Sequence, residues 1–175
     1  MSNLIRMVYV STTTRPVNKD SGGVQVDVGR ILLQARKNNP ARQIGGVLYF
    51  DNNYFFQCLE GEQQEVNQVF QKIMSDPRHA DVQTISVKHI QKRMFSNWSM
   101  KYVALEDRVR DFLSANGFAA FKPYQFNDAM IEKMLTLFVA TRDKTALPDQ
   151  SYGRQPVKQK SGFLSRLLGR KAEAA

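Results

Sequence analysis

A glutamine lies inside an otherwise apolar segment with the composition of a β-strand, Tyr54-Phe55-Phe56-Gln57-Cys58-Leu59-Glu60-Gly61. Successive side chains of a strand point to opposite faces, so Gln57 shares its face with Phe55 and Leu59. An amide buried among apolar side chains must find hydrogen-bond partners, because an unpaired buried polar group costs free energy. The segment therefore predicts a polar partner at this point of a sheet.

Three other segments place polar or unusual residues where such a partner is needed. Tyr9 lies in the strand-like run Met7-Val8-Tyr9-Val10, and Trp98-Ser99-Met100 opens the last strand-like run. Asn38-Asn39 ends a helix-like run before Pro40, which stops the helix. The apolar stripe of that helix continues to Asn39, so this asparagine is predicted to face the sheet.

The hydrophobic periodicity predicts an α+β fold. Strands are predicted over residues 4–10, 45–50, 54–60, 82–90 and 97–105, with a helix after the first strand and another after the third. Asp51-Asn52-Asn53 has the composition and length of a hairpin turn. The order βαββαββ, with two helices on one sheet face, predicts a ferredoxin-like sandwich over residues 1–105.

The rest of the chain is predicted to be an extension followed by a tail. Residues 106–142 contain two apolar helical patterns and are predicted to pack on the open sheet face or on another subunit. Residues 143–175 form a polar, basic linker and tail whose composition favours disorder. Within the tail, a short basic amphipathic helix is predicted from Phe163, Leu164, Leu167 and Leu168.

Composition excludes several classes of protein. With 175 residues, the chain suits one globular domain plus an appendage. The single cysteine, Cys58, excludes an internal disulfide, and its apolar context indicates a packed thiol. No apolar run approaches the roughly 18 residues that span a bilayer, and the amino terminus lacks the order of a signal peptide, so a cytoplasmic protein is expected. Seven basic and two acidic residues in 144–175 put +5 of the net charge of +9 in the tail.

Taken together, these motifs resemble the BLUF family of blue-light photoreceptors, which hold FAD. The resemblance covers about residues 3 to 105. It rests on separated motifs, namely Phe56-Gln57-Cys58-Leu59-Glu60-Gly61, Asp76-Pro77-Arg78-His79 and Arg93-Met94-Phe95-Ser96-Asn97-Trp98-Ser99-Met100. Each residue taken alone also has an ordinary explanation, with Tyr9, Trp98 and Met100 as core residues and Asn39 as a helix-end residue. Their occurrence together, in this order, is what indicates the family.

The resemblance implies roles around the flavin ring. It assigns Asn39 to the carbonyl and imide edge of the ring, and Gln57 to the region between N5 and O4. Tyr9 would lie on the far side of Gln57, and Asn38 near a face of the ring. Trp98 and Met100 would complete the photoactive group.

The resemblance also implies residues for the rest of the cofactor. Asp76 would hold the polar side chain of FAD, while Lys72 and Arg78 would lie near its phosphate end. Some relatives have arginine in place of Lys72, and lysine acts more as a point charge.

A hydrogen-bond switch is the mechanism that the resemblance implies. Light makes the flavin a strong oxidant, Tyr9 gives up an electron, and its proton travels through the Gln57 amide before charge recombines. Gln57 is left rotated or tautomerised, which shifts the flavin spectrum to the red without net redox change, and the last strand senses it through Trp98 and Met100. A change in one hydrogen bond is worth roughly 0.5 to 1.5 kcal/mol, so it biases only a nearly balanced element.

Three functions compete. The principal hypothesis is a non-enzymatic photoreceptor that changes its binding to a downstream regulatory protein or to its own subunits, as a homo-oligomer, with no direct nucleic-acid contact and with weak contact of the tail to anionic membrane. The alternative is a basic nucleic-acid-binding module, which needs exposed aromatic and basic side chains on the open sheet face. A small flavin oxidoreductase needs an open path to the ring, which Tyr9 and Gln57 would block. No catalytic triad, paired carboxylates or metal-ligand spacing stands out, so neither an enzyme nor a metal site is expected.

Overall fold

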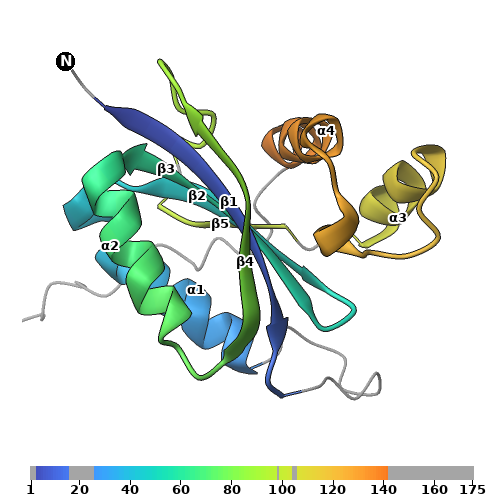
Figure 1. Cartoon of the computed structure of the whole chain (residues 1–175), viewed down its shortest axis with the longest axis horizontal. Helices are drawn as coiled ribbons and strands as arrows, with labels where there is room; N and C mark the ends of the chain where they lie inside the picture. The colour runs from blue at the N-terminus through green and yellow to red at the C-terminus, as the bar shows by residue number, and fades with distance from the viewer. Residues whose placement is uncertain (1–2, 16–25, 98, 104–105, 142–175) are drawn as a thin grey trace, which may run out of the picture. The chain divides into compact units, whose positions relative to one another are not determined.

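Five strands form one sheet with different helices on its two faces (Figure 1). The computed structural model describes residues 3–15, 26–97, 99–103 and 106–141. The strand order is β4-β1-β3-β2-β5, antiparallel except for the parallel pair β2 and β5. The strands are β1 Leu4–Thr13, β2 Gly45–Asp51, β3 Tyr54–Glu62, β4 His79–His89 and β5 Lys101–Val103.

A tight hairpin sets the register of the two central strands. Asp51 pairs with Tyr54, and the two residues between them, Asn52 and Asn53, have positive φ angles of 48° and 67°. Asparagine enters this left-handed region more readily than most residues, and two such residues match the turn that right-twisted hairpins prefer. The resulting registers place Gln57 of β3 between Leu48 of β2 and Tyr9 of β1.

Helices α1 (Val26–Asn38) and α2 (Gln63–Met74) cover one face of the sheet (Figure 1). A short 3₁₀ helix, η1 (Pro40–Arg42), follows α1. The core under these helices contains Ile5, Met7, Tyr9, Val28, Ile31, Leu32, Leu48, Phe55, Leu59, Val66, Met100 and Tyr102. The predicted ferredoxin-like arrangement is therefore confirmed, including the shared face of Phe55 and Leu59.

Helices α3 (Glu106–Ala115) and α4 (Asp128–Ala140) lie on the opposite side of the sheet (Figure 1). The 3₁₀ helix η2 (Pro123–Gln125) precedes α4. Phe138 of α4 packs against Tyr49 and Phe56 of the sheet, with ring centroids 5.4 Å and 5.9 Å apart. Of the two placements open from the sequence, the extension takes the sheet face, and its described residues belong to the same compact unit as the sheet.

This covered face argues against the nucleic-acid alternative. That alternative requires exposed aromatic side chains on the open sheet, whereas Tyr49 and Phe56 are fully buried beneath α4. Cys58 of the same face is a buried free cysteine, and burial raises the pKa of its thiol well above the ordinary value. The predicted packed thiol is confirmed, because a buried neutral thiol is a poor nucleophile.

Several predicted strand boundaries differ from those of the structure. Among the described residues of the last strand, which was predicted over 97–105, pairing with β2 begins at Lys101 and covers Lys101–Val103. Met100 precedes that strand, and its apolar side chain is buried in the core. The first strand was predicted to end at residue 10 and continues to Thr13. The fourth was predicted to begin at residue 82 and begins at His79. Trp98 and the tail after residue 141 lie outside the described residues.

A buried ion pair ties the centre of the sheet to the segment before β5. Arg6 Nε donates to Glu60 Oε1 at 2.7 Å, and Glu60 Oε2 accepts the Phe95 N–H at 2.9 Å. Arg6 also reaches Glu132 of α4 at 3.3 Å. Glu60 is fully buried, so both of its oxygens depend on these partners.

Replacing Glu60 by alanine should lower the free energy of unfolding by about 3 to 5 kcal/mol, because Arg6 is left buried without its main counter-charge. The matched control is Glu132→Ala, which removes the more exposed carboxylate from the same arginine and should cost about 1 kcal/mol or less. Urea denaturation followed by circular dichroism measures both. Equal losses in the two variants would show that the buried pair is not the anchor.

Gly46 is predicted to tolerate no side chain, because a Cβ there would lie 2.1 Å from the Cys58 carbonyl oxygen and 3.3 Å from Met100 Cε. The first neighbour is backbone and cannot move aside, so Gly46→Ala should destabilise the fold by several kcal/mol or displace β2 from β3. Gly29 of α1 is the control, since a Cβ there meets nothing within 4 Å and alanine should stabilise the helix by roughly 0.5–1 kcal/mol. Thermal unfolding distinguishes the two, and a Gly46→Ala protein as stable as Gly29→Ala would refute the close approach.

Candidate functional site

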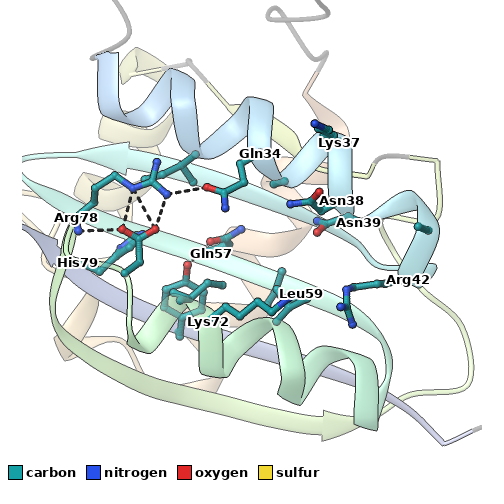
Figure 2. Close-up of a pocket in the computed structure, with 17 residues that line it drawn as sticks. Gln34, Lys37, Asn38, Asn39, Arg42, Gln57, Leu59, Lys72, Arg78 and His79 are labelled. Atoms are coloured by element: carbon teal, nitrogen blue, oxygen red, sulfur yellow. Dashed lines mark hydrogen bonds and ion pairs between the residues drawn. The ribbon is translucent and has the colours of Figure 1, made fainter.

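A cavity of about 360 Å³ lies between α1 and α2, above the central strands (Figure 2). Helix α1 and η1 supply one wall, α2 supplies the other, and β1 and β3 form the floor. The lining residues are Tyr9, Ile31, Gln34, Ala35, Lys37, Asn38, Asn39, Ala41, Arg42, Gln57, Leu59, Val69, Lys72, Ile73, Asp76, Arg78 and His79.

Most of the predicted site residues meet in this cavity. Those that line it are Tyr9, Asn38, Asn39, Gln57, Lys72, Asp76 and Arg78. Met100 lies behind Gln57 and is not a lining residue, although it contacts that side chain. Trp98 falls outside the described residues, so its predicted place in the photoactive group stays a prediction.

The Gln57 amide is held from two sides. Tyr9 Oη donates a hydrogen bond to Gln57 Oε1, and Gln57 Nε2 donates to Met100 Sδ at 3.4 Å. Thioether sulfur is a weak acceptor, so this second bond is easily exchanged for a better one. Burial raises the pKa of the Tyr9 phenol far above its ordinary value of 10. The polar partner predicted from the strand pattern is therefore Tyr9, in its neutral form.

Asn39 joins the end of α1 to the segment that precedes β5. Its Nδ2 donates to the Ser99 carbonyl oxygen at 2.7 Å, and its side chain is almost fully buried. Its backbone carbonyl accepts the N–H groups of Arg42 and Ile44 as the chain turns through η1. This fixes the asparagine at the cavity wall, as the helix pattern predicted.

Asp76 and Arg78 form a charged cluster at one end of the cavity (Figure 2). Arg78 Nε donates to Asp76 at 2.8 Å, and another guanidinium nitrogen donates to Gln34 Oε1 of α1 at 2.9 Å. Hydrogen bonding to Arg78 holds the pKa of Asp76 below its ordinary value. Gln34 received no role from the sequence, although its position four residues before Asn38 puts both on one helix face.

His79 lies beside this cluster, next to Tyr9. Its Nδ1 and Ser11 Oγ are hydrogen-bonded at 2.7 Å, and its ring lies 4.6 Å from that of Phe55. Burial lowers the pKa of His79 to about 4, so the imidazole is neutral near pH 7. Sequence reasoning assigned it no role beyond its place in a motif.

At the other end of the cavity, Arg42 bridges the two helical walls (Figure 2). It donates to Glu65 at 2.7 Å and to Gln68 at 2.8 Å, both on α2. Its role was also missed by sequence reasoning, because η1 was not predicted as an element.

These residues fit a flavin. Ligand pockets are commonly about 300–1,000 Å³, mostly apolar, with a few placed polar groups. Here the apolar floor and walls include Ile31, Leu59, Val69 and Ile73, while Asn39 and Gln57 supply amide donors and acceptors. Cationic side chains of Lys72 and Arg78 suit phosphate oxygens. Within the described parts of the chain, no cluster of His, Cys, Asp or Glu suits a metal ion.

Acid should weaken the fold through His79. The unfolded imidazole takes up a proton below about pH 6.5, whereas the folded one stays neutral down to about pH 4. The unfolded state therefore binds more protons in this window, and the free energy of unfolding falls as the pH drops from 6.5 to 4. Between pH 7 and 5 the loss from this group should be about 1 to 2 kcal/mol.

Urea titrations of parent and His79→Gln at both pH values, at one FAD concentration, measure this loss. The variant should show the smaller decrease, and His89→Gln, which replaces an exposed histidine, should behave like the parent. An identical decrease in all three proteins would remove His79 as the cause.

The sequence of this chain is similar to those of proteins whose function is described. The chain is 30% identical over 131 residues to the photoactivated adenylate cyclase subunit beta of Euglena gracilis, covering 70% of this chain and 15% of that protein. It is 28% identical over 115 residues to the blue light- and temperature-regulated antirepressor BluF of Escherichia coli, covering 63% of this chain and 28% of the relative. The chain thus spans less than a third of the length of either relative.

Two solved structures match this chain over almost their whole length. The photo-activated state of BlsA is 33% identical with a TM-score of 0.72, covering 80% of this chain and 97% of that one. The ground state of BlsA is 32% identical with a TM-score of 0.70, covering 86% and 99%.

The family model for sensors of blue light using FAD matches residues 4–101, which contain β1 to β4 and the whole cavity lining. Sheet order, cavity and these similarities agree, and the chain belongs to the BLUF family.

Proposed function

We propose that this FAD-dependent blue-light sensor acts as a non-enzymatic switch, whose dark and lit states differ in affinity for a regulatory protein. The observation that carries the proposal is the buried Gln57 amide, held between the Tyr9 hydroxyl and the Met100 thioether. An amide presents a donor on one side and an acceptor on the other, so its rotation exchanges the two. Rotation would let Gln57 Nε2 donate to the Tyr9 oxygen and would break the bond to Met100, because a thioether has no hydrogen to donate.

The cavity suggests how the cofactor is held. In this proposal Asn39 and Gln57 bind the polar edge of the ring, and Asn38 lies beside a ring face. Asp76 binds the polar chain of the cofactor, while Lys72 and Arg78 neutralise its phosphates. Arg78 already bridges Asp76 and Gln34, so its guanidinium is presented at the cavity end.

Bound FAD supplies light absorption and, in its excited state, a strong oxidant. Tyr9 is the electron donor of the switch, because it is buried at the cavity and its hydroxyl contacts Gln57. Loss of an electron makes a phenol strongly acidic, so its proton passes to the Gln57 amide. When electron and proton return, Gln57 remains rotated or tautomerised and makes a different set of hydrogen bonds. The contact with Met100 changes as a result, and residues 99–103 carry the change out of the site.

The hypothesis of a flavin oxidoreductase has less support than that of a photoreceptor. For an oxidoreductase, substrate would have to reach the ring past Tyr9 and Gln57, which occupy the cavity floor. A regulatory-protein partner is supported by the similarity to BluF, which is described as an antirepressor.

Homo-oligomerisation, cytoplasmic location and contact of the residue 143–175 tail with anionic membrane remain predictions. In the part of the chain that the structure describes, no helix has the length and apolarity to cross a bilayer.

Replacing Tyr9 by phenylalanine should keep FAD binding and abolish the red-shifted state, because only the hydroxyl that donates to Gln57 is removed. Absorption spectra before and after blue light measure the shift. Tyr49→Phe is the matched control, since it removes another buried tyrosine hydroxyl on the opposite face of the sheet and should cycle like the parent. A full light-induced shift in Tyr9→Phe would contradict the proposed mechanism.

A further inference from the structure

Lys101 is a fully buried lysine at the first position of β5. Its Nζ donates to the carbonyl oxygen of Thr141 and, at 3.3 Å, to that of Val139. Both carbonyls belong to the C-terminal end of α4, about 40 residues away in sequence. The start of the edge strand is thus attached directly to the end of the helix that covers the opposite face.

The position of Lys101 follows from strand alternation. Met100 packs in the core beneath α1 and α2, where it accepts from Gln57. Within β5, Tyr102 packs in that same core, so Lys101 shares the other face of the strand with Val103, which packs in the core that contains α4. Two adjacent residues therefore reach the two sides of the sheet, one contacting the switch amide and the other contacting α4.

Lys101 brings a positive charge from the sheet to the end of α4. The carbonyls at a helix C-terminus carry partial negative charge, which basic side chains commonly offset. The last turn of α4 contains no basic residue of its own. Thr141 closes the turn by donating its hydroxyl to the Phe138 carbonyl at 2.8 Å, and Lys101 supplies the cation from the sheet. A buried ammonium needs such acceptors, so strand and helix end hold each other in place.

Strand β5 is suited to move with Met100. It has three residues, lies at the edge of the sheet, and pairs with Val47, Leu48 and Tyr49 of β2. Among the described residues, Arg6 of β1 and Lys88 of β4 form ion pairs with Glu132 of α4. Those two strands are held by long antiparallel ladders. A displacement that starts at Met100 therefore reaches α4 at its C-terminal end.

We propose that Lys101 is a positioning residue that couples the Gln57–Met100 contact to the C-terminal turn of α4. The inference rests on the proposed switch and names its route out of the site. Light changes the bond to Met100, the short strand shifts, and the ammonium of Lys101 changes its hold on the Val139 and Thr141 carbonyls. The last turn of α4 then differs in stability between the dark and lit states, which alters the surface offered to a partner.

Hydrogen exchange measured by mass spectrometry on the full-length, FAD-loaded protein tests this route. In the parent, amides of residues 138–141 should exchange at rates that differ by about two- to tenfold between darkness and continuous blue light, as expected for a change in one hydrogen bond. Amides near Glu132 should change less. Absorption spectra recorded on the same samples report the red shift separately.

Lys101→Met should retain the red shift and lose the light-minus-dark difference at residues 138–141. If Lys101 only stabilised the end of α4, Lys101→Met would instead raise the exchange rates equally in the dark and in the light. The light-minus-dark difference would then remain. Lys101→Arg, which keeps the charge and the donors, should restore part of the difference. Lys88→Met is the matched control, because it removes a lysine that binds α4 from β4 and should leave the difference unchanged.

The outcomes separate the inference from the proposed function. A parent without any red shift would refute the switch itself. A normal red shift with identical exchange of residues 138–141 in darkness and light would overturn only the coupling route, as would a full difference in Lys101→Met. If Lys101→Met does not retain FAD, Lys101→Gln is judged by the same criterion.

Discussion

The buried amide of Gln57 is the interaction on which the arrangement of this molecule depends. A side chain with a donor and an acceptor, placed on an apolar sheet face, needs one partner of each kind. Tyr9 supplies the hydroxyl, and Met100 accepts through a sulfur that binds only weakly. One side of the amide is therefore firmly bound and the other is easily exchanged. This asymmetry lets a small input at the cavity change the bonding without disturbing the fold.

Backbone features remote from the amide determine that it meets these partners. The two asparagines of the β2–β3 turn set the register, and a slip of one residue would send Gln57 to the face covered by α4. Gly46 permits β2 to approach β3 where any Cβ would collide with the Cys58 carbonyl. Asn39 holds the Ser99 carbonyl and so fixes the segment that ends at Met100. Chemistry at the site thus depends on Gly46, Asn52 and Asn53, which do not line the cavity, as well as on Asn39, which does.

The faces on which Gln57 and Asn39 lie were predictable from the sequence, because the hydrophobic periodicity of a strand and of a helix includes these two residues. The alternation around Gln57 identified its face, and the helical stripe identified Asn39 as buried; both are confirmed. The short last strand was not predictable, because burial of Met100 and strand pairing give the same apolar pattern. The roles of Gln34 and His79 arise from contacts with residues more than 40 positions away, which no local pattern encodes. The contact of Lys101 with the end of α4 was likewise not predictable, because its acceptors are backbone carbonyls about 40 residues away.

A change of one hydrogen bond, roughly 0.5 to 1.5 kcal/mol, must act on an element that is held by little more than that. The ladders of β1 with β3 and β4 are too extensive to respond. Strand β5 has three paired residues, so it opposes such a change with far fewer ladder hydrogen bonds than β1. The large ionic anchor of Arg6 and Glu60 keeps the rest of the sheet fixed meanwhile. Extensive and short strand ladders are thus found on different strands, and the coupling that we propose through Lys101 acts at the short one, β5.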